Sequence, residues 1–202
     1  MASPVGKSRL EAYSDGVFAI VVTLLVLDVR LPESGPESAE ALALQLWHVA
    51  PKVASWVLSF VMATIVWVNH HQFLHQLRHV DRTFLFMNSL LLLCVSFVPF
   101  PTGVLGAHAM DPAALRFFGA AFLAAGVSFF ALRLYARRAG LYEQAIEPRM
   151  ARDATRRSFV AVAGYVAGIA VAGTSAFGAW ACYVVVAVWF VLPSHAERGT
   201  AG

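Results

Sequence analysis

The chain has 202 residues, of which 59% are apolar and 13% are charged. A soluble domain carries about half apolar and about a quarter charged residues, so this composition excludes a soluble protein and indicates an integral membrane protein without a large extramembrane domain. The formal net charge is +3, but no basic patch is interleaved with aromatic residues, and we therefore expect no nucleic-acid partner. The positive charge instead reflects membrane topology and anionic lipid.

The first predicted membrane span covers residues 12–30 and has roughly the length of a bilayer crossing. Charged residues lead directly into it, unlike the start of a cleavable secretory signal, so we expect this helix to be retained. Asp15 lies just inside the span, where an unpaired charge is costly, and must therefore have partners.

A helical projection at about 100° per residue divides this span into two faces. Asp15 projects to the same side as Phe18, Val22 and Val26. The other face is largely apolar, with Thr23 as its polar aliphatic residue, and comprises Tyr13, Gly16, Ile20, Thr23, Leu24, Leu27 and Leu31.

Five more predicted spans follow an acidic segment rich in Pro, Gly and Ser and a short amphipathic stretch at 42–49. Pro99 and Pro101 are expected to end the third span, because proline removes a backbone donor. The last two spans form a tight helical hairpin after a basic segment at 137–157. The five spans cover residues 53–73, 83–98, 113–135, 158–173 and 177–192. The sequence thus predicts an all-α fold with six transmembrane helices.

The distribution of Lys and Arg predicts the orientation, because cytoplasmic loops carry the excess of these residues. An inside N-terminus leaves only Arg30, Lys52 and Arg116 outside, and places the other twelve of the 15 Lys and Arg inside. We therefore expect both termini to be cytoplasmic in a cell membrane.

Polar residues of the first three spans then fall at a similar depth. Trp67, His70 and His71 share one helical face, and Asn88 begins the next span at the same level. A network of Arg9, Asp15, Trp67, His70 and Asn88 is therefore predicted. Two roles stay open: holding the first helix in place, or moving protons or ions directly.

Catalytic and metal-binding patterns are weak. His71 and His75 lie one helical turn apart, a spacing that suits a transition metal, but no further histidine or carboxylate motif completes a site. No nucleophile elbow, phosphate loop or pair of intramembrane carboxylates is present, so we expect neither an enzyme nor a metal. Cys94 and Cys182 fall within apolar runs and are expected to be small buried hydrophobic residues.

Small residues in the fifth predicted span indicate close helix packing. Gly164 and Gly168 have the four-residue spacing that lets helices approach, and the same packing role is predicted for Gly119 and Gly126. The potassium filter built from backbone carbonyls has a Thr-Val-Gly-Tyr-Gly loop, which this chain lacks. Any ion selectivity must therefore come from side chains.

The segment RLEAYSDGVFAI at 9–20, the WVNHHQF segment at 67–73 and Asn88 together resemble the endosomal and lysosomal transmembrane potassium-channel family and its bacterial homologues. The hallmark of that family is Arg-x-x-x-Phe-Ser-Asp at the start of the first helix, and here Tyr13 stands in place of the Phe. The resemblance covers the first three spans well and the last three by topology only.

The resemblance implies a bacterial single-repeat form that assembles as a homotetramer, with four copies of the first helix around the pore. Ile20 then takes the narrowest position, Thr23 forms a polar layer, and Leu24 and Leu27 lie further outward. By the same resemblance, the buried network that holds this helix comprises Arg9, Ser14, Asp15, Trp67, His70 and Asn88.

The predicted function is a leak-like, potassium-selective cation channel, with no cofactor beyond the permeant potassium ion. One alternative is a proton-coupled secondary transporter, or a proton-conducting protein, that uses Asp15 and His70. No pair of broken helices in corresponding halves supports the transporter. A structural membrane protein without transport activity is the third possibility.

Overall fold

The computed structural model describes the backbone of residues 6–31, 39–143 and 148–191, and the side chains of these residues except 39–41 and 148–158. Within that part, all elements are helical apart from one isolated bridge. They are α1 (Lys7–Leu24), the short 3-10 helix η1 (Leu25–Asp28), α2 (Ala39–His75), α3 (Arg82–Phe97), α4 (Pro99–Ala107), α5 (Pro112–Arg138), α6 (Pro148–Val171) and α7 (Ala176–Val191). The all-α prediction is confirmed.

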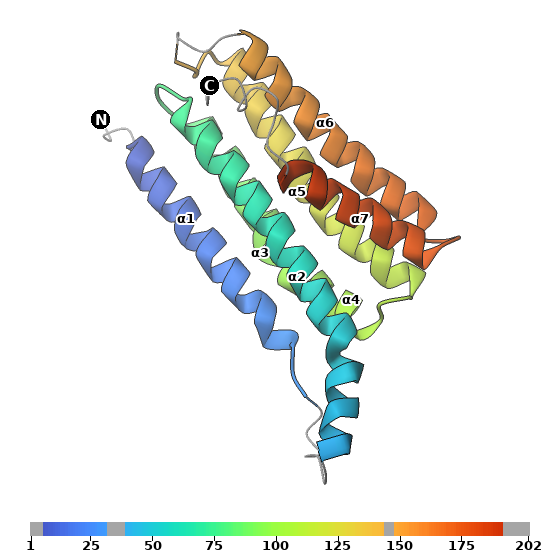
Figure 1. Cartoon of the computed structure of the whole chain (residues 1–202). Helices are drawn as coiled ribbons and strands as arrows, with labels where there is room; N and C mark the ends of the chain where they lie inside the picture. The colour runs from blue at the N-terminus through green and yellow to red at the C-terminus, as the bar shows by residue number, and fades with distance from the viewer. Residues whose placement is uncertain (1–5, 32–38, 144–147, 192–202) are drawn as a thin grey trace, which may run out of the picture.

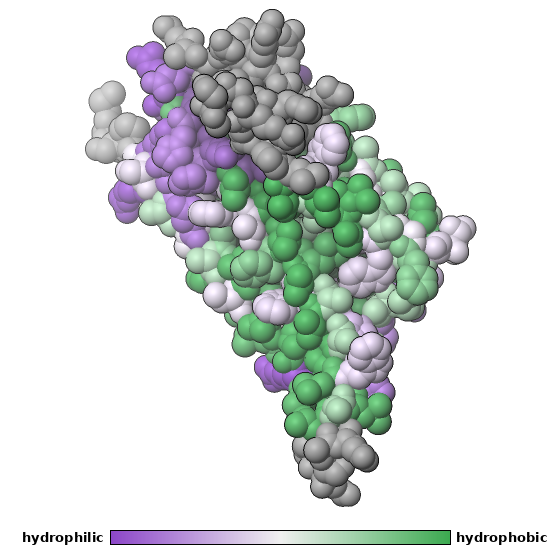
Figure 2. Space-filling model, viewed as in Figure 1, coloured by the Kyte–Doolittle hydropathy of each residue, from purple (hydrophilic) through white to green (hydrophobic). Residues whose placement is uncertain are grey.

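Among the described residues, four helical segments are long and apolar enough to cross a membrane: Lys7–Asp28, Leu42–His75, Arg82–Ala107 and Pro112–Arg138. Two shorter apolar helices, Phe159–Val171 and Ala176–Val191, lie at the fifth and sixth predicted spans. The six-span count therefore stays a prediction. Apolar side chains cover the middle of the visible face, and hydrophilic ones gather at the end where α1 begins (Figure 2).

Helix α3 ends at Phe97, close to the predicted end of the third span at 98, but the helical conformation does not stop at Pro99 and Pro101 as predicted. Val98 keeps helical dihedral angles, φ −53° and ψ −38°, and α4 continues to Ala107. Pro99 is tolerated because it occupies the first turn of α4, where its missing N–H has no helical acceptor. The helix of the second span likewise begins earlier than predicted, since 42–49 belongs to α2, which contains Pro51.

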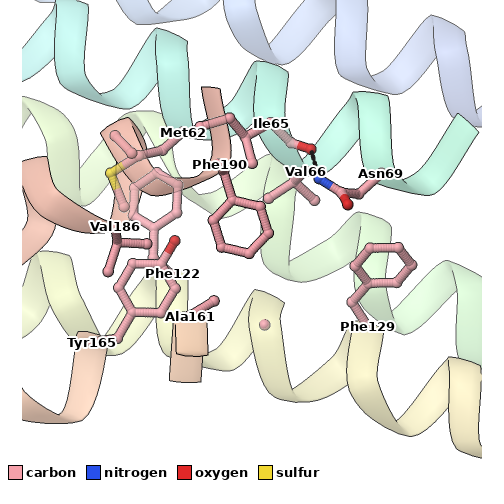
Figure 3. A pocket seen from close by; sticks show the side chains of 12 residues that line it. Met62, Ile65, Val66, Asn69, Phe122, Phe129, Ala161, Tyr165, Val186 and Phe190 are labelled. Atoms are coloured by element: carbon pink, nitrogen blue, oxygen red, sulfur yellow. Dashed lines mark hydrogen bonds between the residues drawn. The ribbon is translucent and has the colours of Figure 1, made fainter. Parts of the chain in front are cut away.

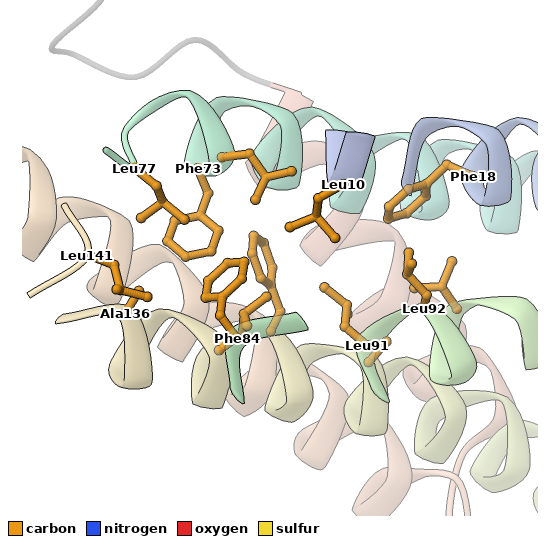
Figure 4. Close-up of a cluster of buried hydrophobic side chains, with 14 of the residues drawn as sticks. Leu10, Phe18, Phe73, Leu77, Phe84, Leu91, Leu92, Ala136 and Leu141 are labelled. Carbon is orange, nitrogen blue, oxygen red and sulfur yellow. The ribbon is translucent and has the colours of Figure 1, made fainter. Parts of the chain in front are cut away.

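The helices lie side by side, with α1 at one edge of the bundle, where it packs mainly on α2 and α3 (Figure 1). Beside α1 lies an apolar core in which leucine and phenylalanine side chains of α1, α2 and α3 meet (Figure 4). A second core joins α5, α6 and α7 around Phe118, Phe122 and Tyr183. Since α1 is covered on one side only, its other side is free for contacts outside the chain.

Glycines set the close approach of α6 and α7, as predicted. A Cβ at Gly164 would collide with Val186, and one at Gly168 would collide with the ring of Tyr183. A Cβ at Gly119 in α5 would likewise collide with the Tyr183 hydroxyl. Gly126 differs, because a Cβ there would meet its neighbours only at ordinary contact distances, so the packing prediction was wrong for this residue.

Backbone and side-chain contacts tie together the end of the bundle where α1 begins. Lys7 Nζ donates to the carbonyl of Leu77 at 2.9 Å. The amide of Arg78 donates to the carbonyl of Leu141 at 2.9 Å, which joins the α2–α3 turn to the segment after α5. The predicted basic segment 137–157 starts here, but residues 144–147, the side chains of 148–157 and Arg198 lie outside the described part.

Candidate functional site

The buried and exposed faces of α1 are clearly separated. Its buried residues, three or four positions apart, are Leu10, Ser14, Phe18, Val21 and, in η1, Leu25. The large side chains of the predicted apolar face are exposed: Tyr13 58%, Ile20 60%, Leu24 42%, Leu27 51% and Leu31 43%. This face is thus turned away from the rest of the chain. Its role in lining a pore stays a prediction.

The buried face of α1, on the side of Phe18, is narrower than the helical projection suggested. Phe18 is 2% exposed, but Val22 is only half-buried and Val26 is 43% exposed. The reason is that α2 and α3 cover a single strip of α1, so residues at the margins of this strip keep part of their surface open.

Thr23 brings an aliphatic hydroxyl to the exposed face, two residues from Val21 on the buried side. Its Oγ1 lies 2.8 Å from the carbonyl of Ile20 and 3.1 Å from that of Ala19. A hydroxyl has one proton to donate and two lone pairs that accept. The proton is therefore used within the helix, and the lone pairs remain for a group outside it.

Three fully buried polar residues join α1, α2 and α3. Asn88 Nδ2 donates to Ser14 Oγ at 3.1 Å, and Asn88 Oδ1 lies 2.7 Å from His70 Nε2. Because the Asn88 amide nitrogen faces Ser14, its oxygen faces the ring, and Nε2 must carry the proton. The ring of His70 is packed between Phe18 and Phe129, with centroid distances of 5.7 and 5.9 Å.

Asp15 is held by a separate contact. The indole Nε1 of Trp67 donates to Asp15 Oδ1 at 2.8 Å, and Asp15 is half-buried. Arg9 is exposed, and its guanidinium forms no hydrogen bond or ion pair within the part of the chain that the structure describes. The structure therefore brings five of the six predicted network residues together, in two branches, and leaves Arg9 outside.

Arg133 in α5 is a half-buried charged residue that was not among the predicted site residues. Its Nη2 donates to the carbonyl of Asn69 at 3.3 Å, and its Cζ lies 4.4 Å from the ring centroid of Phe129. The available signal was an arginine in a mostly apolar part of α5, between Leu132 and Leu134, which calls for a polar partner. Arg133 links α5 to the same turn of α2 that holds His70.

The two histidines at the end of α2 contact each other. The Nε2 atoms of His71 and His75 are 3.2 Å apart. Among the described residues, no group of three or more His, Cys, Asp or Glu is placed to hold a metal ion.

Known proteins match this chain both in the sequence of its first three helices and in its whole fold. The family described as endosomal/lysosomal potassium channel TMEM175 matches residues 9–99. A potassium channel of Streptomyces collinus is 34% identical over 194 residues, which cover 91% of each chain. The crystal structure of a lysosomal potassium-selective channel TMEM175 homolog from Chamaesiphon minutus aligns with a TM-score of 0.81 and 29% identity, over 96% of this chain and 98% of that one.

A human relative carries a different functional name. The endosomal/lysosomal proton channel TMEM175 of Homo sapiens is 32% identical over 117 residues, which cover 54% of this chain and 23% of the human protein.

Proposed function

Because the chain belongs to the family of the endosomal/lysosomal potassium channel TMEM175, we propose that it forms a potassium-permeable channel in a bacterial cell membrane. The family consists of ion channels and not of enzymes. The Streptomyces and Chamaesiphon relatives, both named for potassium, span nearly the whole chain. Their names support potassium as the permeant ion.

The pore is formed by four copies of the chain, with α1 of each copy facing the axis. A single helix cannot enclose a path for ions, so the exposed face of α1 needs further copies beside it. The observation that carries this proposal is the one-sided anchoring of α1: Ser14 and Asp15 are hydrogen-bonded to α3 and α2, which turns Ile20 away from the chain.

Ile20 forms the narrowest ring, and it acts on ions through pore size and wetting. An apolar side chain offers a permeating ion nothing to replace its water, so the ring blocks the path when it dewets. Thr23, one turn further along, presents its oxygen lone pairs to hydrated ions. Leu24 and Leu27 continue the apolar lining outward.

The proposed orientation places both termini in the cytoplasm. Lys7 and Arg78 lie at the end of the bundle where α1 begins, and Arg30 and Lys52 belong to segments at the opposite end. The charge asymmetry thus follows the long axis of the bundle, as the positive-inside rule requires.

Replacement of Ile20 tests the constriction. The change Ile20→Asn keeps the helix and eases wetting, so we expect larger currents and poorer discrimination between potassium and sodium. Reversal potentials recorded from the protein in planar bilayers measure the relative permeability to potassium and sodium. The control is Val22→Asn, on the half-buried side of α1, which should disturb packing and leave selectivity as it was. Unchanged conductance and selectivity in Ile20→Asn, with altered selectivity in Val22→Asn, would show that α1 is rotated from this assignment.

Proton permeation is the second candidate function. It is favoured by the name of the human relative and by the buried Nδ1 of His70, which has no hydrogen-bond partner among the described residues. Vesicles that contain a pH dye distinguish a proton-permeable channel from a coupled carrier. Passive acidification of the vesicles indicates proton permeation, and proton uptake driven by a potassium gradient indicates a coupled carrier. Potassium flux without acidification would restrict the channel to potassium.

A further inference from the structure

Two buried tyrosines in the second half of the bundle differ in their hydrogen bonding. The hydroxyl of Tyr183 in α7 donates to the carbonyl of Leu115 at 2.9 Å. Tyr165 in α6 is only 6% exposed, but its hydroxyl has no hydrogen-bond partner in the part of the chain that the structure describes. Buried tyrosine hydroxyls are normally bonded, because an unpaired one is costly. The Tyr165 hydroxyl is not among the fully enclosed unpaired atoms of the described residues, so its proton is available to a molecule from outside the chain.

The Tyr165 side chain borders a cavity between α2, α5, α6 and α7. The cavity has a volume of about 50 Å³ and is partly open to the outside. Figure 3 shows the Tyr165 hydroxyl directed toward the space between Phe122 and Phe190. The unpaired donor thus points into the cavity and not into packed protein.

The walls of this cavity are almost entirely apolar. Apart from the Tyr165 hydroxyl, the polar side chain that lines it is Asn69, whose Nδ2 donates to the carbonyl of Ile65 in its own helix at 2.8 Å. An ordered water needs about two to four polar partners, more than this lining offers at one point. An apolar body with one hydrogen-bonding group matches the lining better.

Gly126 keeps the cavity open. A Cβ at this position would stand 3.8 Å from Tyr165 Cε2 and 3.8 Å from Val162 Cγ2, which is ordinary contact. The other glycines of these helices are closed by side chains of the facing helix, as Gly168 is by Tyr183. Helix packing therefore does not require Gly126, and an alanine there would take up free space beside Tyr165.

We propose that this cavity binds a small amphiphile from the lipid phase, of the class of alkyl alcohols and alkylphenols, with the Tyr165 hydroxyl as its hydrogen-bond partner. Such a molecule brings a hydroxyl oxygen that accepts from Tyr165. The part of its alkyl or aryl body next to the hydroxyl lies between Phe122 and Phe190, and the rest extends through the open side of the cavity. It enters from the bilayer, because two of the lining helices, α2 and α5, are membrane-span candidates.

Photolabelling tests the site without any measurement of ion flux. The full chain in phosphatidylcholine vesicles is labelled with an octanol that carries a diazirine on its alkyl chain, and the modified residues are mapped by mass spectrometry. We expect saturable labelling at cavity residues such as Met62 and Phe122, which unlabelled octanol displaces.

Three variants make the test specific. Tyr165→Phe should raise the octanol concentration needed for half-saturation by roughly fivefold, which is the effect of losing one neutral hydrogen bond. Gly126→Ala, which fits without displacing its neighbours, should lower labelling by filling the space. Tyr183→Phe removes a hydroxyl outside the cavity and should leave labelling as in the wild type. The proposal would be overturned by labelling that does not saturate, that is confined to the outer surface, or that is equal in all variants. It would also be overturned by the absence of labelling, which would mean that the cavity holds only water.

Discussion

Replacement of Asn88 is the sharpest test of how α1 is held. Asn88 lies in α3, is fully buried, and bonds both to His70 in α2 and to Ser14 in α1. The change Asn88→Leu keeps a similar volume and removes both bonds. It also leaves the Nε2 proton of His70 without its acceptor in a ring already packed between Phe18 and Phe129.

The expected loss follows from the two bonds and the unpaired donor. Hydrogen bonds between membrane helices average about 0.6 kcal/mol and reach about 1.7 kcal/mol, so two contribute roughly 1–3 kcal/mol. An unsatisfied buried donor adds a desolvation penalty of about 1–3 kcal/mol. The gain of apolar contacts from the leucine offsets part of this sum. We expect Asn88→Leu to lower the free energy of unfolding by about 2–4 kcal/mol.

Unfolding in detergent micelles with increasing denaturant, followed by tryptophan fluorescence, measures this loss. Ser89→Ala is the matched control, because Ser89 is exposed and donates only to Leu85 in its own helix; we expect a change within about 0.5 kcal/mol. A double-mutant cycle with Ser14→Ala isolates the bond from α3 to α1. A loss below about 0.5 kcal/mol for Asn88→Leu, with no coupling to Ser14, would refute the view that this network fixes α1.

Three further predictions concern packing, pH and assembly. Gly168→Ala places a Cβ against the Tyr183 ring and should destabilise the α6–α7 pair by about 1–3 kcal/mol in the same unfolding assay. Burial raises the pKa of Asp81, but hydrogen bonds from the Tyr135 hydroxyl and the Phe84 amide outweigh it and hold this pKa below its usual 3.8. The stability that Asp81 contributes is therefore present above pH 3.8 and lost as the pH falls through the lowered pKa; thermal unfolding across this range should show the loss in the wild type and not in Asp81→Asn. Native mass spectrometry should show four copies per particle, and a conducting monomer would contradict the shared pore.

The sequence alone determined the all-α fold class, the approximate positions of most helices and the exposed face of α1. Apolar runs of the required length, broken by polar segments, leave few alternatives to membrane helices. The face that contains Ile20 and Leu27 followed from the period of the helix, which is a local property. The similar depth of Asp15, Trp67 and Asn88 also followed from counting residues along helices of known rise.

Only the tertiary structure decided which polar groups meet. Counting residues along separate helices placed Asp15 and His70 at the same depth. The rotation and spacing of the helices instead pair Asp15 with Trp67 and His70 with Asn88 by hydrogen bonds. Arg9 is left outside for the same reason. Rotation depends on contacts summed over α2, α3 and α5, which no local pattern in the sequence contains.

The structure also decided where proline and glycine change the chain. Pro99 follows the end of α3 but also begins α4, because a proline costs little in the first turn of a helix. Gly126 and Gly168 look alike in the sequence, yet one borders a cavity and the other a tyrosine ring. What faces a residue from a distant helix is a property of the assembled bundle, and the local sequence does not specify it.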